Sequence, residues 1–318
     1  MLKWVLIFFI ILVLLLILIY NIINQNESKA LYFPSKRRVW KPKVNYKSVY
    51  INVNDSYDVV YDRKDRKKNA EYISGWHFDN FKNAKTIMFC HGNTGNITNR
   101  KYIIDICTKF KLNLFVFDYR GFGESSSHPN KLALREDGEL AYEYLHHTCK
   151  IPNRKIIIWG ESLGGLPAAY AASKFNCGGL ILICTFSSLD EILTYRFEGT
   201  SKAAAEFLTT LLSYKIDMIP VKNYLVDVRC PVAIVHSSKD EMIPYACSWI
   251  NYHSIKHSNK LHIRIKGRHA SPDIKSDQLR EIFEFCELSL DDLSSDVNIS
   301  DMLENLRTVA ERYNNFMD

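Results

Sequence analysis

The sequence predicts an α/β fold built on a mostly parallel, doubly wound sheet. Three observations support this fold class: short apolar runs rich in Ile, Val, Leu and Phe, helix-like stretches between those runs, and a length of 318 residues, which is enough for one sizeable core. Apolar runs of this kind are typical of strands buried on both faces of a sheet. Their alternation with helices indicates repeated βα units, which pair their strands in parallel.

The predicted elements occupy residues 46–290, which we expect to form one domain. Two extended segments, at 48–53 and 71–78, come first and suggest an antiparallel entry into the sheet. The predicted buried strands are 86–90, 113–117, 155–159, 180–184 and 231–236, with a last strand at 261–265. The predicted helices include 99–109, 131–147, 163–173 and 277–288.

Residues 190–229 interrupt this alternation with a mostly helical pattern. An insertion at this point of the chain follows a strand and therefore lies over the carboxyl ends of the parallel strands. Open α/β sheets bind their ligands at those ends. We interpret the segment as a small helical cap over the site.

The first 23 residues predict one transmembrane helix. No charged residue interrupts the stretch from Trp4 to Tyr20, and about twenty helical residues span a bilayer core. Aromatic rings at its two ends suit the membrane interfaces. The alternative is a cleaved secretory signal, but the apolar run is longer than usual for one, and the small-x-small pattern at 28–30 lies far beyond it. We expect an uncleaved anchor, followed by a polar linker at 24–45.

The charges around this span favour a cytosolic domain. One lysine, Lys3, precedes the span, and four basic residues follow it at positions 29 and 36–38. Eight cysteines without CxxC pairs, several inside apolar runs, are typical of reduced core cysteine. Four N-x-S/T sequons would suit a lumenal face, so both orientations stay open.

The net charge of +6 is concentrated in two basic clusters, at 36–38 and 63–68. Near an anchor, such clusters suit contact with anionic lipid, although a solvated hairpin tip explains the second equally well. The chain has no basic helix with interleaved aromatics and no zinc-like Cys/His spacing, so we expect no nucleic-acid partner, no metal and no other cofactor. The acidic tail at 291–318 has helical periodicity, which suits docking on the domain or binding a partner.

A candidate nucleophile lies where one predicted strand meets the next helix. The strand 155–159 runs into Gly-Glu-Ser-Leu-Gly at 160–164, followed by a stretch rich in alanine. A serine between two glycines at such a junction can occupy a strained nucleophile elbow, because glycine lets the backbone pass where a side chain would clash. The helix that follows directs its N-terminal dipole at the hydroxyl. The sequence therefore predicts Ser162 as a nucleophile.

Serine needs a base to take its proton and an acid to orient that base. Asp240 lies just past the strand 231–236, and His269 lies just past the strand 261–265. Each candidate thus stands at the carboxyl end of its own strand, in the chain order Ser, Asp, His that suits a hydrolase elbow. The other histidines do not follow strand ends in this order. We predict the triad Ser162, Asp240 and His269.

Stabilising the oxyanion of an acyl intermediate needs two preorganised N–H donors. One donor is predicted to be the backbone of Leu163, directly after the nucleophile. The other is predicted in the loop 91–96, and we assign it to the backbone of Asn93. In the same loop His91 is expected to brace the backbone, and Arg120, in the glycine-rich turn 118–125, is expected to have a structural role.

Four motifs in one order carry a family resemblance. They are His-Gly-Asn-x-Gly-Asn at 91–96, Asp-Tyr-Arg-Gly-Phe-Gly at 118–123, Gly-Glu-Ser-Leu-Gly-Gly at 160–165 and Asp-x-x-Ile-Pro at 240–244. Over residues 30–288 the chain resembles the alpha/beta-hydrolase domain-containing proteins, members 13 and 17. The resemblance implies the α/β-hydrolase fold, the same triad, and ester or thioester substrates. Members of this group have an amino-terminal anchor or a lipidated cysteine cluster, and this chain lacks the cluster.

Three positions depart from the family pattern. Ser237 stands where a glycine usually precedes the acid, Arg268 stands where a glycine precedes the base, and Pro167 lies early in the nucleophile helix. None of these residues removes a catalytic group. Arg268, beside the base, is expected to influence the charge preference for substrate.

Together these features predict a single-pass, membrane-anchored serine hydrolase. Its expected substrates are carboxylic esters or thioesters, in acyl lipids or acylated proteins, and its expected partners are the bilayer and such a substrate. Two alternatives stay open: a serine peptidase that uses the same triad, and a membrane-tethered binding protein whose triad is idle. No substrate-binding residue can be assigned from the sequence.

Overall fold

A computed structural model describes residues 31–197 and 220–288 of the chain. The strands are β1 Phe33–Pro34, β2 Lys47–Asn52, β3 Asp55–Val60, β4 Tyr72–Phe78, β5 Thr86–Cys90, β6 Thr94–Gly95, β7 Asn113–Asp118, β8 Ile156–Glu161, β9 Gly179–Ile183, β10 Val232–Ser237, β11 Lys260–Arg268 and β12 Ser271–Asp273. The helices are α3 Lys101–Lys109, α4 Lys131–Glu143, α5 Gly165–Lys174, α6 Leu189–Phe197, α8 Val221–Leu225, α9 Ala246–Ser254 and α10 Ser276–Phe285.

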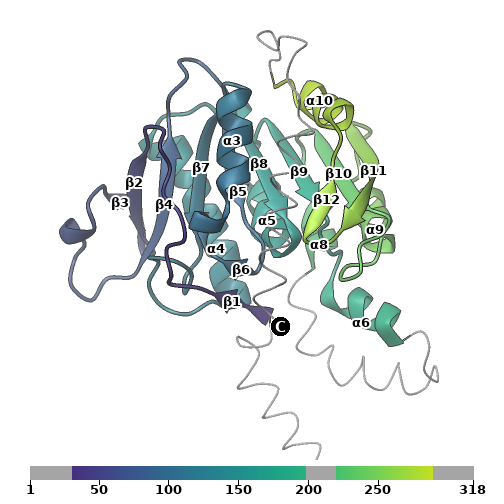
Figure 1. The fold of residues 1–318 in the computed structure, drawn as a ribbon, viewed down its shortest axis with the longest axis horizontal. Coiled ribbons are helices and arrows are strands. Elements are labelled where there is room, and N and C mark those ends of the chain that lie inside the picture. Colours follow the sequence, from purple (N-terminus) through teal and green to yellow (C-terminus); the bar gives the residue numbers. More distant parts are fainter. Residues whose placement is uncertain (1–30, 198–219, 289–318) are drawn as a thin grey trace, which may run out of the picture.

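Within the described residues, ten of the strands form one mixed sheet (Figure 1). Their order is β12-β11-β10-β9-β8-β5-β7-β4-β2-β3. The neighbours from β11 to β7 pair in parallel, whereas β12 at one end and β4, β2 and β3 at the other pair antiparallel. The predicted mostly parallel sheet with an antiparallel entry is confirmed.

The central strands bury both of their faces because successive side chains point to opposite sides of the sheet. In β8, Ile156 and Ile158 pack into the core beneath α4 and α5, while Ile157 and Trp159 pack into the core beneath α3 and α10. Figure 1 shows α3 and α10 on the near face of the sheet and α4 and α5 behind it. This arrangement explains why the strands read as continuous apolar runs.

Parallel strands place their carboxyl ends at the same edge of the sheet. The segments that follow β5, β7, β8, β10 and β11 therefore meet there. They contain the residues that the sequence predicts for catalysis. The fold thus positions the candidate site at this edge.

Part of the predicted linker lies against the domain. Tyr32 is buried, and β1 pairs in parallel with β6, where Phe33 faces Thr94 and Pro34 faces Gly95. Backbone hydrogen bonding of this kind leaves no hydrophobic pattern in a sequence, which is why the segment was predicted as a linker.

Several predicted segments fall outside the described residues. They are the anchor at 1–23, the middle of the cap at 198–219 and the tail at 291–318. Of the predicted cap, the structure describes α6 and α8 at its two ends. No helix among the described residues is long and apolar enough to cross a bilayer.

Candidate active site

Ser162 lies at a sharp turn between β8 and α5. A single 3₁₀ turn, Ser162–Gly164, joins the strand to the helix. The backbone φ of Ser162 is 52°, in the left-handed region that residues other than glycine rarely adopt. Strain of this kind persists only where the surrounding structure imposes it, and it gathers at functional sites. The local geometry is that of the predicted nucleophile elbow.

The glycines around Ser162 are required by close packing. A Cβ on Gly164 would lie 2.0 Å from the carbonyl oxygen of Cys90 in β5, and one on Gly165 would lie 2.0 Å from Thr185 Cγ2. A Cβ on Gly160 would lie 2.6 Å from the carbonyl oxygen of Gly164. The turn is thus pressed against its neighbours, and this packing holds the strained serine.

The structure brings Ser162, His269 and Asp240 together from the ends of three different strands. Ser162 Oγ lies 2.9 Å from His269 Nε2, and His269 Nδ1 lies 2.7 Å from Asp240 Oδ2. In this arrangement Nδ1–H donates to the carboxylate, and Nε2 accepts from the serine hydroxyl. The side chain of Asp240 is fully buried, and that of His269 is 10% exposed. A proton can therefore pass from the serine to a base that an ionised acid orients.

Asp240 is held by more donors than the sequence suggested. Its Oδ1 accepts from the backbone N–H groups of Met242 and Ile243 at 2.9 and 2.8 Å, and its Oδ2 lies 3.4 Å from His236 Nε2. Burial alone raises the pKa of Asp240, but the hydrogen bonds from His236, His269 and Ile243 outweigh it and hold that pKa well below its usual range. The acid is therefore ionised. Sequence reasoning missed these supports, although the four-residue spacing of His236 and Asp240 was a signal.

The base lies on a more exposed turn between β11 and β12. The backbone N–H of His269 donates to Glu241 Oε2 at 3.0 Å, and Arg268 Nε donates to Glu241 Oε1 at 3.2 Å. Gly267 has a φ of 93°, which only glycine adopts readily. The cation of Arg268, which we expected to influence substrate charge, is thus paired with Glu241 beside the site.

The loop at 91–96, here the oxyanion loop, passes beside the nucleophile. A Cβ on Gly92 would lie 3.7 Å from Ser162 Cβ. His91 is fully buried, its ring centroid lies 4.4 Å from that of Tyr119, and its Nε2 lies 3.5 Å from Asp118 Oδ1. These contacts are those of a residue that braces the loop, as the sequence predicted. Leu163 directly follows Ser162, and Asn93 directly follows Gly92, so both predicted oxyanion donors belong to segments that approach Ser162.

Two further contacts hold the segments next to the site, the residue before Ser162 and the turn after β7. Tyr102 of α3 donates its hydroxyl to Glu161 Oε2, directly before the nucleophile. Arg120 donates to the fully buried Asp137, with Nε lying 2.7 Å from Oδ1. The pair with Asp137 fixes the turn after β7 and agrees with the structural role expected for Arg120. The contact between Tyr102 and Glu161 joins two elements distant in sequence and was not predicted.

Comparison with known proteins agrees with this geometry. A family model described as the alpha/beta hydrolase fold matches residues 85–208. The esterase Pf2001 of Pyrococcus furiosus superposes with a TM-score of 0.58 at 20% identity, over 80% of this chain and 98% of that chain. This chain has the α/β-hydrolase fold.

The hydrolase-fold chain also has distant homologues. It is 28% identical over 223 residues to the uncharacterized membrane protein YNL320W of Saccharomyces cerevisiae, covering 68% of this chain and 75% of that protein. It is 30% identical over 162 residues to alpha/beta hydrolase domain-containing protein 17C of Xenopus tropicalis, covering 51% of this chain and 48% of that protein. The resemblance carried by the four motifs is confirmed as distant homology.

One group of potential metal ligands includes Asp240 and lies next to His269. Among the described residues, Cys184, His236 and Asp240 are the group whose ligand atoms lie within 4.8 Å of one another. Asp240 Oδ2 is already bound by His269, so a metal ion at this place would compete with the hydrogen bond that orients the base. These three residues are better explained as part of the hydrogen-bonded surroundings of Asp240 than as the ligands of a metal ion.

Proposed function

We propose that this protein is a serine hydrolase that cleaves carboxylic esters or thioesters through an acyl-enzyme on Ser162. The observation that carries the proposal is the continuous hydrogen-bonded path from Ser162 Oγ through His269 to an ionised Asp240, at a strained elbow. Esterases among the proteins of similar fold agree with this reaction class. Fold alone does not define chemistry, so the proposal rests on the site.

In the first half-reaction, Ser162 Oγ forms a bond to the acyl carbon while its proton passes to His269 Nε2. The electron pair of the carbonyl π bond moves to the oxygen, which becomes an oxyanion. Backbone N–H groups of Leu163 and Asn93 are the proposed donors to this oxyanion. Removing one such donor typically lowers kcat by roughly 10²–10³.

The intermediate then collapses, and the bond to the alcohol or thiol leaving group breaks. The leaving group takes the proton from His269, and an acyl-enzyme remains. In the second half-reaction a water molecule gives its proton to His269 and attacks the acyl carbon. Collapse of the second oxyanion returns the proton to Ser162 Oγ and releases the acid. Asp240 stays ionised throughout and stabilises the imidazolium.

A membrane setting narrows the proposed substrate. The predicted anchor at 1–23 and the naming of YNL320W as a membrane protein both support a site tethered to a bilayer. The basic residues that follow the span, at 29 and 36–38, support a domain in the cytosol. A tethered site under the proposed cap at 190–229 is well placed for acyl lipids or acylated proteins. We therefore propose acyl lipids or acylated proteins as the substrates of this hydrolase.

Labelling with a fluorophosphonate probe tests the proposal. The full-length chain in detergent is compared with Ser162→Ala and with Ser173→Ala. Ser173 is a matched control because it lies in α5, the helix that follows Ser162, and its hydroxyl donates to the carbonyl of Tyr170. We expect labelling of the wild type and of Ser173→Ala, and loss of labelling in Ser162→Ala. Equal labelling of all three would contradict the proposal.

Substrate panels then separate the remaining alternatives. Short and long acyl esters, an acyl thioester and unmodified peptides are offered to the same three proteins. Hydrolysis of esters and thioesters that depends on Ser162 supports the proposal. Turnover of peptides alone would identify a peptidase, and neither labelling nor turnover would identify an idle binding protein.

A further inference from the structure

The strap, which we define as residues 31–39, runs along the oxyanion loop. Phe33 N–H donates to the carbonyl of Asn93 at 2.9 Å, and Ser35 N–H donates to the carbonyl of Gly95 at 3.0 Å. The side chain of Asn93 in turn donates to the carbonyl of Leu31 at 3.2 Å. The strap therefore holds both the carbonyl and the side-chain amide of Asn93. The group proposed to meet the oxyanion is the backbone N–H of this same residue.

Asn96 joins the strap to the loop from within. Its side chain is buried, and its Nδ2 donates to the carbonyls of Ser35 and Arg37 at 2.8 and 2.9 Å. Its Oδ1 accepts from the backbone N–H of Thr98 at 2.8 Å. A buried amide whose donors and acceptor are all satisfied specifies one arrangement of the groups it connects. Here it connects the strap with the turn that ends the oxyanion loop.

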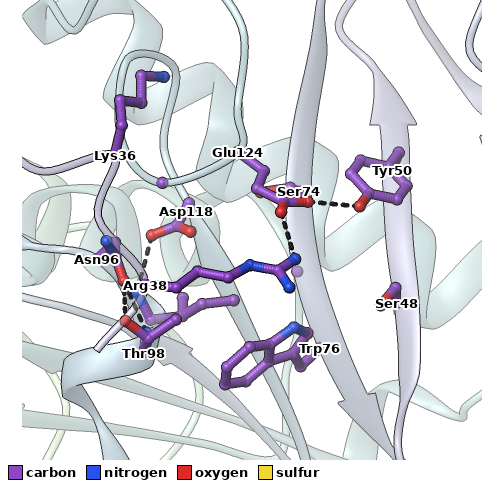
Figure 2. A pocket seen from close by; sticks show the side chains of 13 residues that line it. Lys36, Arg38, Ser48, Tyr50, Ser74, Trp76, Asn96, Thr98, Asp118 and Glu124 are labelled. Atoms are coloured by element: carbon purple, nitrogen blue, oxygen red, sulfur yellow. Dashed lines mark hydrogen bonds and ion pairs between the residues drawn. The ribbon is translucent and has the colours of Figure 1, made fainter. Parts of the chain in front are cut away.

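The strap is also fastened at its far end. Figure 2 shows Arg38 reaching across a small pocket to Glu124, whose other carboxylate oxygen accepts from Tyr50 Oη at 2.6 Å. Lys36 Nζ donates to the carbonyl of Ser125 at 2.8 Å. Lys36 and Arg38 of the strap thus each bind a group of the turn after β7, the carbonyl of Ser125 and the carboxylate of Glu124. The pocket serves as an attachment of the strap.

The oxyanion loop needs such support because little regular structure holds it. It contains Gly92 and Gly95, and Gly95 has a φ of 74°. Catalytic donors act only when they are preorganised, and a misplacement of about 1 Å can cost roughly 10²-fold in rate. Tyr119, in the turn after β7, donates its hydroxyl to the carbonyl of His91 at 2.8 Å and holds the loop from inside the domain, and the strap holds it from the other side.

We propose that the strap is a positioning element of the active site, with Asn96 as a positioning residue that acts through the Asn93 backbone. This inference rests on the proposed function. The backbone of the strap thus helps to position the oxyanion loop and is more than a connection to the domain.

The sharpest test removes one hydrogen bond of the strap. Phe33→Pro deletes the N–H that donates to Asn93, whereas Phe33→Ala keeps that N–H and removes a side chain that is about half exposed. For Phe33→Pro we expect kcat on a soluble ester to fall about tenfold, less than the roughly 10²–10³ for loss of a whole donor, with KM within about twofold. Phe33→Ala should retain the kcat of the wild type.

Asn96→Ala extends the test from the loop side. We expect a lower kcat and weaker binding of a boronic acid inhibitor, whose tetrahedral adduct uses the oxyanion site. The midpoint of the pH–rate profile should not move, because the hydrogen bonds of His269 among the described residues are with Ser162, Glu241 and Asp240 and not with the strap. A merely structural role would lower the melting temperature and leave the kcat of the folded enzyme unchanged.

Ser162→Ala is assayed beside these variants to separate the two proposals. An inactive Ser162→Ala with full kcat in Phe33→Pro and Asn96→Ala would overturn the role of the strap and leave the hydrolase proposal intact. An equal loss in Phe33→Ala and Phe33→Pro would also overturn it. Full activity in Ser162→Ala would overturn both proposals.

Discussion

The two halves of the candidate active site are built in different ways. The inner half, with Ser162 and the oxyanion loop, is set by close packing: glycines without room for a Cβ, a buried His91 and the pair between Arg120 and Asp137. The outer half, with Asp240 and His269, is set by hydrogen bonds on turns after β10 and β11. His269 is further held by the half-exposed Glu241.

Because of this difference, substitutions in the two halves should affect different properties of the protein. Steric packing fixes the strained nucleophile, so substitutions of the closely packed glycines and of the pair between Arg120 and Asp137 should act mainly on stability. Hydrogen bonds fix the tautomer and direction of the base, so substitutions of the buried acid should act mainly on rate. The predictions below can break or sharpen this division.

The largest effect is expected in the outer half, from Asp240→Asn. The amide oxygen can still accept from Met242 and Ile243, but the amide group opposite His269 no longer fixes the productive tautomer. We expect kcat to fall by about 10⁴, with the protein still folded at the temperature of the assay. The measurement is ester turnover together with thermal unfolding. Loss of the fold rather than of the rate would contradict the division.

Within the inner half, Arg120→Ala should destabilise most. It removes the guanidinium that pairs with the fully buried Asp137, which keeps only the backbone N–H of residue 120 as a donor among the described residues, and breaking a buried pair in this way costs about 3–5 kcal/mol. Urea unfolding measures the loss. Lys101→Ala, which breaks the exposed pair with Asp105, is the matched control and should cost less than about 0.5 kcal/mol. Equal losses would show that burial of the pair is unimportant.

Gly164→Ala tests the steric part of the same half. The added Cβ would meet the carbonyl oxygen of Cys90 at 2.0 Å, and overpacking of a buried site costs about 1–3 kcal/mol. Gly92→Ala is the matched control, because its Cβ would find ordinary contacts at 3.7 Å and beyond. We expect the free energy of unfolding to fall for Gly164→Ala and to stay near the wild-type value for Gly92→Ala. The opposite order would contradict the packing argument.

The lowered pKa of Asp240 predicts how its contribution depends on pH. A carboxyl whose folded pKa lies below its unfolded value, about 3.9, adds stability that is fully present above that value and is lost as pH falls through the folded pKa. The difference in unfolding free energy between the wild type and Asp240→Asn should therefore shrink as pH falls below about 4. Urea titrations from neutral to acidic pH measure it. If this difference in unfolding free energy instead grew as the pH fell, the predicted contribution of Asp240 would be contradicted.

The smallest effect is expected for Glu241→Gln. Glu241 is 41% exposed at its side chain, so its charge is screened, and Arg268 remains free to find water. Exposed pairs contribute less than about 1 kcal/mol, and kcat should stay within a few-fold of the wild type. Turnover at low and high salt provides the measurement. A fall comparable to that of Asp240→Asn would place Glu241 within the catalytic core of the outer half.

Much of the fold could be predicted from the sequence because its signals are local. A strand buried on both faces is an unbroken apolar run, so the predicted strands 86–90, 113–117 and 155–159 fall on β5, β7 and β8 within a residue or two. The strand β3 was missed because it lies at the sheet edge, where it is partly exposed and polar. The pairing of β1 with β6 was missed because it depends on the approach of two distant segments.

The candidate site divides in the same way. Ser162 could be found because the elbow imposes glycine at fixed neighbouring positions, and Asp240 and His269 because they follow strands. The contacts of Asp240 with His236 and of Tyr102 with Glu161, and the hold of Asn96 on the strap, form only when the chain folds. The sequence contains these residues without any periodic pattern that would reveal their partners.

The assignment of Ser162 as the nucleophile can be tested most directly by mapping the covalent adduct. The full-length protein is treated with a fluorophosphonate until its esterase activity is lost, and the modified peptide is identified by mass spectrometry. We predict one adduct per chain, on Ser162, with activity falling in proportion to its formation. An adduct on another residue, or full activity in protein that is completely modified at Ser162, would contradict the assignment.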